Sequence, residues 1–369
     1  MSSNRDGFDI GIICALPLEA RAVKAMLEEV NEEIGYGADN GGTGKTPADT
    51  NTYTIGKIGH HKVVLVHMSG MGKIPAAAAA TNLKQSFGSI KLALLVGICG
   101  GAPGKGAESI MLGDVVVGKQ VVHYDFGREH ENGFQRKDNP EDRPSKQNSE
   151  IQSFIRKLEA GKGALEEKTY EHLAAMLESL SPEQIDDLQD NLYPPDCWHI
   201  HQNHKYCDGQ RCKNCEEICD SALKSSCEEL KCDQDALIRR GERKQKPNIH
   251  FGWVASGDKV IKSAAVRDKI AEKEGIIAFD MEAAGVWDYL PCILIKGVSD
   301  YADSHKNGRW QEYAAIAAAA CAKAILEQWD RADKQHQQYQ VKNQFNNHNS
   351  KIAYQADQAN NYGTQHFTF

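Results

Sequence analysis

Two uninterrupted apolar runs, far apart in the chain, constrain its fold more than any other feature. They are Leu92–Val96 and Pro291–Ile295, and neither alternates apolar with polar residues. A strand of this kind is buried on both faces, as in a parallel sheet that is covered by helices on either side. Open sheets of this type bind their ligands beyond the carboxyl ends of the strands. We therefore expect a ligand site among the residues that follow each run.

Apolar strands alternate with helical segments in two parts of the chain. Strand character marks Phe8–Ala15, Thr52–Ile58, Lys62–Met68, the run that begins at Val115, Ile249–Ala255, Ile276–Phe279 and Cys292–Val298. Helical spacing or alanine-rich composition marks Pro17–Val30, Ile74–Phe87, Ala264–Glu274 and Arg309–Trp329. This alternation predicts one mostly parallel α/β domain. We place the domain at residues 1–330, with its core at 8–125 and 248–330 and an insertion at 126–247.

Charge and hydropathy exclude two classes of partner. The formal net charge is -8, with 43 Lys and Arg against 51 Asp and Glu, which argues against general binding to nucleic acid or to an anionic membrane. No run approaches the roughly 20 apolar residues of a transmembrane helix, and Met1–Phe8 has no signal-peptide character. Eleven Cys without a secretory signal indicate reduced thiols. We expect a cytoplasmic protein.

The insertion contains a cluster of Cys and His residues. They are Cys197, His199, His201, His204, Cys207, Cys212, Cys215, Cys219, Cys227 and Cys232. Cys212 and Cys215 have the spacing of a metal-ligand pair, but a clean second pair is missing from the sequence. Two interpretations stay open. One is a structural zinc ion, with Cys207, Cys212, Cys215 and Cys219 as candidate ligands. The other is a set of free thiols, which we favour, so we predict no metal site and no cofactor.

The end of the chain, residues 331–369, is dominated by Gln, Asn and His. It has too few aliphatic residues to bury a core, which predicts a disordered low-complexity tail. Its segment Ala359–Phe367 combines Asn and Gln with Tyr and Phe, a composition that is also prone to cross-β stacking. An amyloid-motif partner is therefore the second interpretation of the tail.

Polar turns follow the predicted strands. Glu19 begins the helix after the first strand, and Ser299 and Asp300 follow the last one. The simpler interpretation of such carboxylates is that they cap helices. However, a scaffold has no need of three carboxylates, Glu19, Glu282 and Asp300, at three strand ends. We therefore favour a catalytic site.

Six motifs occur in order. They are Gly11–Glu19, Ser69–Gly72, Val96–Gly101, Ser256–Asp258, Asp280–Ala283 and Val298–Asp303. Together they resemble the nucleoside phosphorylase and nucleosidase family, in the version found in fungi at the N-terminus of NLR-like receptors. The resemblance covers Phe8–Val117 and Ile249–Trp329. It implies a three-layer α/β/α phosphorylase-type fold with a mostly parallel mixed sheet, a homo-oligomer, an NLR-type partner, and cleavage of the N-glycosidic bond of a purine nucleoside or nucleotide.

The resemblance also implies roles for single residues. Asp300 matches the general acid at the purine N7, with Ser299 beside it. Glu282 matches the acceptor of hydrogen bonds from the ribose hydroxyls. The other substrate-binding positions are Met281 against the ribose, Val260 and Ile261 against the base, and the turn residues Ser69, Gly70, Gly97 and Gly100.

Glu19 decides between hydrolysis and phosphorolysis. Phosphorylases that resemble this chain carry two phosphate-binding arginines where it has Glu19 and Leu95. A carboxylate repels phosphate but can deprotonate water, and the hydrolases of the family have a glutamate at this position. The sequence therefore favours a nucleosidase over a phosphate-dependent phosphorylase. One departure is Ile98, which occupies a position that is a serine in many members.

The group at the 5′ end of the substrate is open. His305, Lys306 and Arg309 are candidates for a 5′-phosphate, and they equally suit a helix N-terminus that faces solvent. If they bind phosphate, the substrate is a nucleotide such as AMP or ATP. Nucleotide depletion in a fungal defence or cell-death response would then be the biological role. A non-catalytic sensor or oligomerisation module with an aggregation-prone tail is the alternative from another class.

Overall fold

The structure is a computed structural model that describes residues 7–31, 45–104, 109–131, 133–180, 188–201, 218–240 and 246–329. The predicted tail, and the candidate ligands Cys207, Cys212 and Cys215, lie outside the described residues. The chain divides into two units, Met1–Ile325 and Leu326–Phe369. Of the second unit only the helical residues 326–329 are described.

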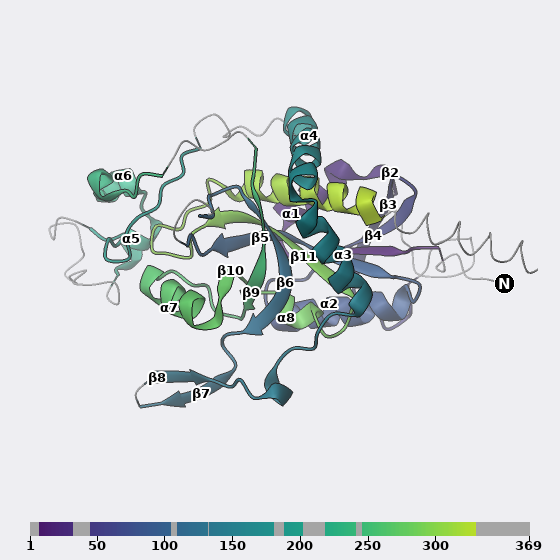
Figure 1. The fold of residues 1–369 in the computed structure, drawn as a ribbon, viewed down its shortest axis with the longest axis horizontal. Coiled ribbons are helices and arrows are strands. Elements are labelled where there is room, and N and C mark those ends of the chain that lie inside the picture. The colour runs from purple at the N-terminus through teal and green to yellow at the C-terminus, as the bar shows by residue number, and fades with distance from the viewer. Residues whose placement is uncertain are drawn as a thin grey trace, which may run out of the picture. The chain divides into compact units, whose positions relative to one another are not determined.

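A nine-stranded sheet forms the centre of the first unit (Figure 1). Its strands, in spatial order, are β10 (Ile276–Asp280), β9 (Ile249–Ser256), β6 (Val115–His123), β11 (Cys292–Asp300), β5 (Leu92–Gly101), β1 (Ile10–Cys14), β4 (His61–His67), β3 (Thr52–Ile58) and β2 (Glu28–Asn31). Five neighbouring pairs are parallel: β1/β4, β1/β5, β5/β11, β6/β9 and β9/β10. The pairs β6/β11, β3/β4 and β2/β3 are antiparallel. The predicted mostly parallel mixed sheet is confirmed.

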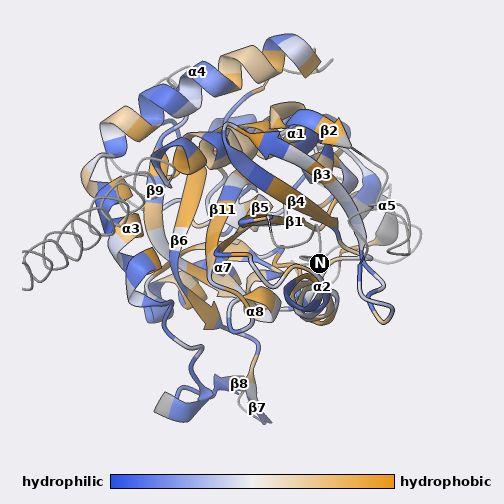
Figure 2. Ribbon diagram, turned by 90° about the vertical axis from the view of Figure 1, so that its right-hand side faces the viewer, coloured by the Kyte–Doolittle hydropathy of each residue, from blue (hydrophilic) through white to orange (hydrophobic). Residues whose placement is uncertain are grey.

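Helices cover both faces of the sheet, which confirms the three-layer α/β/α fold (Figure 1). On one side α1 (Pro17–Met26) packs against α4 (Lys162–Leu180), which follows α3 (Ser149–Ala160). On the other side α2 (Lys73–Ser86) packs against α8 (Ala283–Val286), and α7 (Ala264–Glu274) contacts β10. The strands β5, β6 and β11 in the middle layer are strongly apolar, whereas α4 alternates polar and apolar residues (Figure 2).

A helix at residues 311–325 lies directly on β11. A Cβ atom at Gly297 would be 1.9 Å from the carbonyl oxygen of Ala314, so only glycine allows this approach. Ala314 is fully buried, as are Ile293 and Leu294 in the strand. The small side chains of this alanine-rich helix thus allow it to pack closely against the strand that ends in Asp300.

The segment between β6 and β9 contains short elements besides α3 and α4. They are the hairpin β7 (Gly127–His130) and β8 (Gly133–Arg136), the 3-10 turns η2 (Pro140–Asp142) and η4 (Gln234–Ala236), and the helices α5 (Asp220–Lys224) and α6 (Cys227–Leu230). Because α4 packs against α1, part of the predicted insertion completes a helical layer of the core. None of the helices in the described ranges combines the length and apolar character of a membrane span.

Several element boundaries differ from the prediction. The helix expected to reach Val30 ends at Met26, because Leu27 takes an extended conformation and Glu28 pairs with Lys57 in the sheet. The extension of this helix to Val30 is therefore wrong, and Val30 is exposed on β2. By contrast, β5 and β11 run further than predicted, because Val298 pairs with Cys99 and Asp300 with Gly100.

Candidate active site

The carboxyl ends of β1, β5 and β11 meet at one edge of the sheet, since these three strands are adjacent and parallel. Glu19 stands in the first turn of α1, directly after β1, and Asp300 is the last residue of β11. β10 pairs antiparallel with the end of β5, through Ala278 with Gly101 and Phe279 with Gly100. This pairing brings Glu282, two residues after β10, to the same edge.

Backbone amides hold the Glu19 carboxylate in place. Oε2 accepts hydrogen bonds from the N–H groups of Ala15 (2.9 Å) and Leu16 (2.8 Å), and Oε1 accepts one from Ile98 (2.9 Å). A Cβ atom at Gly97 would lie 2.3 Å from Oε1, so glycine is required there. Burial raises the pKa of Glu19, while Lys296 and the amides of Leu16 and Ile98 oppose the rise. The result is a fixed carboxylate with the increased proton affinity of a general base.

Lys296 is a charged residue of the site that the sequence reading missed. It lies within the apolar strand β11 and is 1% exposed. Its Nζ is 3.2 Å from Asp280 Oδ2 and 3.3 Å from Glu282 Oε2. Burial lowers the pKa of Lys296, but the charges of Asp280, Glu282 and Glu19 outweigh it and hold that pKa above its ordinary value. A lone lysine inside an otherwise apolar strand is the signal that could have revealed it.

Asp300 is 4% exposed and has three polar partners. Ser299 Oγ donates to Oδ2 at 2.9 Å, and the N–H of Ala302 donates to Oδ1 at 2.9 Å. The third partner is Lys306, whose Nζ lies 2.8 Å from Oδ2. Ala302 has a positive φ of 51°, which is uncommon for a residue with a side chain. The turn after β11 is therefore shaped around this carboxylate.

The predicted ribose and base positions lie around Glu282. Glu282 Oε1 accepts a long hydrogen bond of 3.4 Å from the N–H of Gly72, in the turn that contains Ser69 and Gly70. Met281 is half-buried and precedes Glu282. The turn residues Gly97 and Gly100 are buried between the carboxylates, since a Cβ at Gly100 would lie 3.0 Å from Asp300 Oδ1.

Val260 and Ile261, the two positions predicted to contact the base, differ in their surroundings. Val260 is 49% exposed. Ile261 packs against a buried cluster that includes Tyr124, Phe279 and Ala302. Val260 is therefore open to a ligand, whereas Ile261 is partly used by the core.

The three candidates for a 5′-phosphate, His305, Lys306 and Arg309, line one cavity but make different contacts. Lys306 pairs with Asp300, and Arg309 lies 3.4 Å from Glu228 with its side chain 59% exposed. His305 is buried and stacks on Tyr193, with ring centroids 3.7 Å apart. Each of the three side chains thus has a different environment.

A cavity of about 880 Å³ opens on the insertion side of Asp300. Ser299, Asp300 and Lys306 form part of its wall, and the insertion supplies Tyr193 and Cys227. Its basic residues are Lys224, Lys231, Lys262, Lys306 and Arg309, and its acidic ones are Glu228, Asp300 and Asp303. The cavity wall therefore contains Asp300 together with more cationic than carboxylate side chains.

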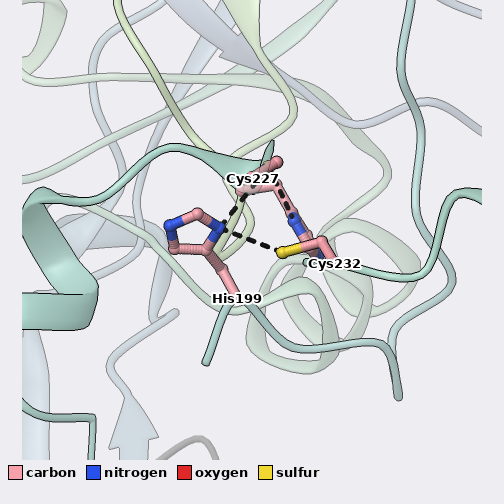
Figure 3. A group of neighbouring side chains, drawn as sticks. His199, Cys227 and Cys232 are labelled. Atoms are coloured by element: carbon pink, nitrogen blue, oxygen red, sulfur yellow. Dashed lines mark hydrogen bonds between the residues drawn. The ribbon is translucent and has the colours of Figure 1, made fainter. Parts of the chain in front are cut away.

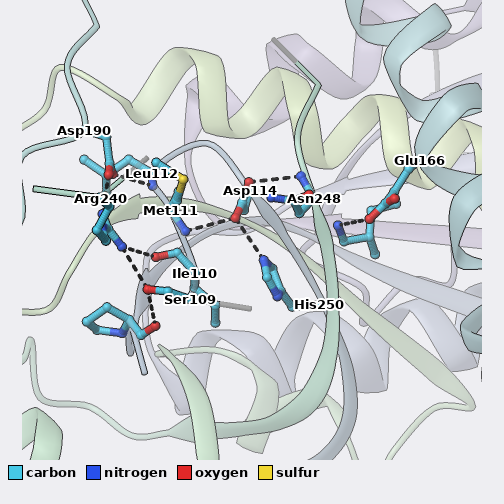
Figure 4. A network of polar contacts seen from close by, with 12 residues as sticks. Ser109, Ile110, Met111, Leu112, Asp114, Glu166, Asp190, Arg240, Asn248 and His250 are labelled. Atoms are coloured by element: carbon cyan, nitrogen blue, oxygen red, sulfur yellow. Dashed lines mark hydrogen bonds and ion pairs between the residues drawn. The ribbon is translucent and has the colours of Figure 1, made fainter. Parts of the chain in front are cut away.

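A buried polar network ties two residues of the insertion, Asp190 and Arg240, to the chain beside Asp300. Asp190 accepts hydrogen bonds from Arg240, from the Tyr301 hydroxyl and, at 3.0 Å, from the N–H of Leu112. Arg240 also donates to the carbonyl of Ile110 at 2.7 Å (Figure 4). Because Tyr301 follows Asp300 directly, this network fixes the wall of the cavity to the end of β11.

A second buried network secures the turn between β5 and β6. Asp114 accepts hydrogen bonds from the N–H groups of Met111 (2.9 Å) and Asn248 (3.0 Å), and its Oδ2 lies 2.9 Å from Nε2 of His250 (Figure 4). These contacts tie β6 to the start of β9, on the far side of the strand that carries Asp300.

The structure gathers a set of possible metal ligands that differs from the four candidates of the zinc interpretation. Cys219, one of those four candidates, lies 3.5 Å from Nδ1 of His201. Elsewhere, His199, Cys227, Cys232 and His305 group their ligand atoms within 4.8 Å of one another. No sequence spacing links His305 to the other three, because it lies beyond the insertion.

Comparisons with known proteins agree with this fold. The family model described as the phosphorylase superfamily matches residues 9–328. A nucleotide-binding leucine-rich repeat (NLR)-like protein of Hyaloscypha variabilis is 31% identical over 329 residues, which are 86% of this chain and 29% of that protein. A 5′-methylthioadenosine/S-adenosylhomocysteine nucleosidase of Mycobacterium bovis is 27% identical over 118 residues, 32% of this chain and 39% of that protein. The alignments thus span under half of either relative.

Solved structures share the fold at low sequence identity. A Helicobacter pylori 5′-methylthioadenosine/S-adenosylhomocysteine nucleosidase has a TM-score of 0.52 at 15% identity, over 87% of this chain and 99% of its own. A Streptococcus pneumoniae MTA/SAH nucleosidase in complex with 8-aminoadenine has a TM-score of 0.51 at 20% identity, over 86% of this chain and 99% of its own.

Proposed function

Because the chain belongs to the phosphorylase superfamily, we propose that it is a nucleosidase, an N-glycosyl hydrolase that releases the free base from a purine nucleoside or nucleotide. The observation that carries this proposal is the Glu19 carboxylate, 2% exposed and held by three backbone amides. Phosphate would need positive charge at this place, and a buried carboxylate repels it. The Glu19 carboxylate can, in contrast, accept a proton from an attacking water molecule. Hydrolysis is therefore favoured over phosphorolysis.

Three carboxylates have separate roles in the proposed reaction. Asp300 donates a proton to a ring nitrogen of the base, and the bonding electrons of the C1′–N bond leave with the base. Water attacks C1′ as Glu19 takes its proton, and Glu282 accepts hydrogen bonds from the ribose hydroxyls. The negative charges of Glu19 and Glu282 stabilise the oxocarbenium-like sugar.

The lysines have supporting roles in the same scheme. When Asp300 has given up its proton, Lys306 pairs with the carboxylate that remains, consistent with the contact of 2.8 Å. Lys296, which is buried, contacts both Asp280 and Glu282 and so holds the two carboxylates close to each other. Ser299 orients the carboxyl group of Asp300.

A nucleotide substrate is supported by the cavity next to Asp300. Its wall contains Lys224, Lys231, Lys262, Lys306 and Arg309. A 5′-phosphate or triphosphate that reached this surface would meet several cations at once. We include AMP and ATP among the proposed substrates for this reason.

The likeness to an NLR-like protein supports a role in signalling. In that role the domain would act as a homo-oligomeric effector that depletes a purine nucleotide in a fungal defence or cell-death response. Its NLR-type or amyloid-motif partners would be reached through residues 331–369. The non-catalytic sensor is the competing function, and activity alone separates the two.

The test is a panel of adenosine, 5′-methylthioadenosine, AMP and ATP, each incubated with and without phosphate and analysed by chromatography. We expect adenine from at least one substrate, at a rate that phosphate does not increase. Release of base from none of them would leave the non-catalytic module. Release that depends on phosphate would establish a phosphorylase.

A further inference from the structure

Two cysteines and two histidines converge on one point between the insertion and the turn after β11. His199, Cys227 and Cys232 come from the insertion (Figure 3), and His305 follows β11. Cys227 Sγ lies 3.5 Å from His199 Nδ1 and 3.6 Å from His305 Nδ1, and Cys232 Sγ lies 3.5 Å from His199 Nδ1. Three of the four residues are nine-tenths buried or more: His199, Cys232 and His305.

These distances are those of a tetrahedral zinc site. With bonds of about 2.3 Å to sulfur and about 2.0–2.1 Å to nitrogen, the edge of the tetrahedron from sulfur to nitrogen is about 3.6 Å. The three observed distances are 3.5, 3.5 and 3.6 Å. Hydrogen bonds alone explain the arrangement less well, because Cys227 Sγ approaches two ring nitrogens and carries at most one proton.

The outer contacts orient both imidazole rings as metal ligands. His199 Nε2 lies 2.9 Å from the carbonyl of Ser225, and His305 Nε2 lies 3.1 Å from the carbonyl of Cys197. Because a carbonyl only accepts, each Nε2 carries the proton and each Nδ1 turns its lone pair toward the thiols. Tyr193 stacks on His305 with an interplanar angle of 15° and fixes that ring.

The backbone places the two sulfur atoms together. Cys227 opens α6, and Lys231 ends the helix in the left-handed conformation with φ of 56°. The chain thereby reverses, and the N–H of Cys232 donates to the carbonyl of Cys227 at 2.9 Å. A residue with a side chain rarely adopts this conformation, so we infer that the contacts of Cys227 and Cys232 stabilise the turn.

We propose that His199, Cys227, Cys232 and His305 bind one Zn²⁺ as a closed, four-coordinate structural site. Two thiolates and two imidazoles in tetrahedral order select zinc among the common metals. The ion joins the insertion to the turn after β11. His305 precedes Lys306, which contacts Asp300, so the metal holds the insertion side of the cavity against the end of the catalytic strand. This inference does not depend on the proposed reaction.

Metal analysis of the full chain, expressed with zinc in the medium, tests the proposal. The Cys227→Ser/Cys232→Ser double variant should lose about one zinc per chain relative to the wild type. Since Cys207, Cys212 and Cys215 lie outside the described residues, the difference between the two proteins is the measured quantity. His305→Ala should lose the same zinc, whereas His305→Cys, which supplies another thiolate, should retain it. Cys321→Ala, at a fully buried cysteine in the helix at 311–325, is the matched control and should retain it.

A second measurement does not depend on the variants folding. Chelation of zinc from the wild type should speed proteolysis within residues 188–201 and 218–240 about tenfold or more, because the metal no longer holds these two segments together. Readdition of zinc should reverse the change. A wild-type chain without zinc overturns the proposal. So does retention of the full zinc content by His305→Ala or by a folded double variant.

Discussion

Lys306 Nζ lies 2.8 Å from Oδ2 of Asp300, at the point where β11 meets the cavity beside the insertion. The pair places an ammonium group between the proposed proton donor and the basic wall of the cavity. A lysine here has two distinguishable uses. It can stabilise the Asp300 carboxylate after proton transfer, and it can contact a phosphate of the substrate.

Lys306→Met separates these uses. If the ammonium contacts a phosphate, kcat/KM for AMP or ATP should fall about 10–100-fold more than for adenosine, since a charge-assisted hydrogen bond contributes about 1.5–3 kcal/mol. If it acts only on Asp300, both classes of substrate should lose activity equally. Steady-state kinetics with adenosine and AMP measure the ratio, and an equal loss would exclude a contact between Lys306 and a substrate phosphate.

Asp300→Asn keeps the shape of the side chain but removes its acidity. Release of adenine should slow about 10²–10⁴-fold, the usual contribution of a general acid. A nucleoside analogue whose leaving group needs no protonation, such as a nitrophenyl riboside, should be cleaved at close to the wild-type rate. Equal losses on both substrates would contradict the role of Asp300 as proton donor.

The pH dependence of kcat/KM should reflect Glu19. Its pKa is raised by burial, and a base is inactive once protonated, so the acidic limb should lie above the ordinary glutamate pKa of about 4.3. The folded state also binds this proton more tightly than the unfolded chain. The contribution of Glu19 to the free energy of unfolding therefore falls as the pH rises from about 4.3 through the raised pKa. An acidic limb at or below the ordinary value would contradict this account.

Gly97→Ala tests the contact between Gly97 and Glu19. The new Cβ would lie 2.3 Å from Glu19 Oε1 and would displace the carboxylate. A displacement of about 1 Å lowers rates about 10²-fold, so a loss of that size is expected in kcat. Gly88→Ala is the control, because nothing lies within 4 Å of a Cβ there. Equal activity of the two variants would show that Glu19 tolerates displacement.

Lys296→Met leaves Asp280 and Glu282 buried without their counter-charge. Breaking a buried ion pair in this way destabilises a protein by about 3–5 kcal/mol, which urea unfolding would measure. Lys119→Met breaks a surface pair, with Lys119 and Glu159 side chains 36% and 41% exposed, and should cost about 1 kcal/mol or less. A similar loss in both variants would contradict the importance of burial at Lys296.

Local patterns in the sequence predict much of the fold. α7 has the expected bounds, Ala264–Glu274, because a capping Ser263 precedes it and Gly275 ends it in the left-handed conformation. The predicted end of α1 at Val30 is wrong, because Glu28 pairs with β3 in the sheet although Val30 has helical spacing. Spacing along the chain carries no information about such a tertiary contact.

Tertiary contacts also limit what the sequence can predict about the site. Glu19, Glu282 and Asp300 follow predicted strands, so the sequence and the topology bring them to one edge. Lys296 and Asp280 were missed, since their ion pair exists only when β10 and β11 meet across β5. Likewise, His305 joins His199, Cys227 and Cys232 only in the folded chain.

The central claim is that water, activated by Glu19, attacks the sugar. Cleavage of adenosine or AMP in water enriched with ¹⁸O, in the presence of phosphate, tests it by mass spectrometry of the sugar product. The account predicts one ¹⁸O atom at C1 of the released ribose or ribose 5-phosphate, and loss of this product in Glu19→Gln. Formation of a sugar 1-phosphate without the label, or undiminished labelling in Glu19→Gln, would contradict it.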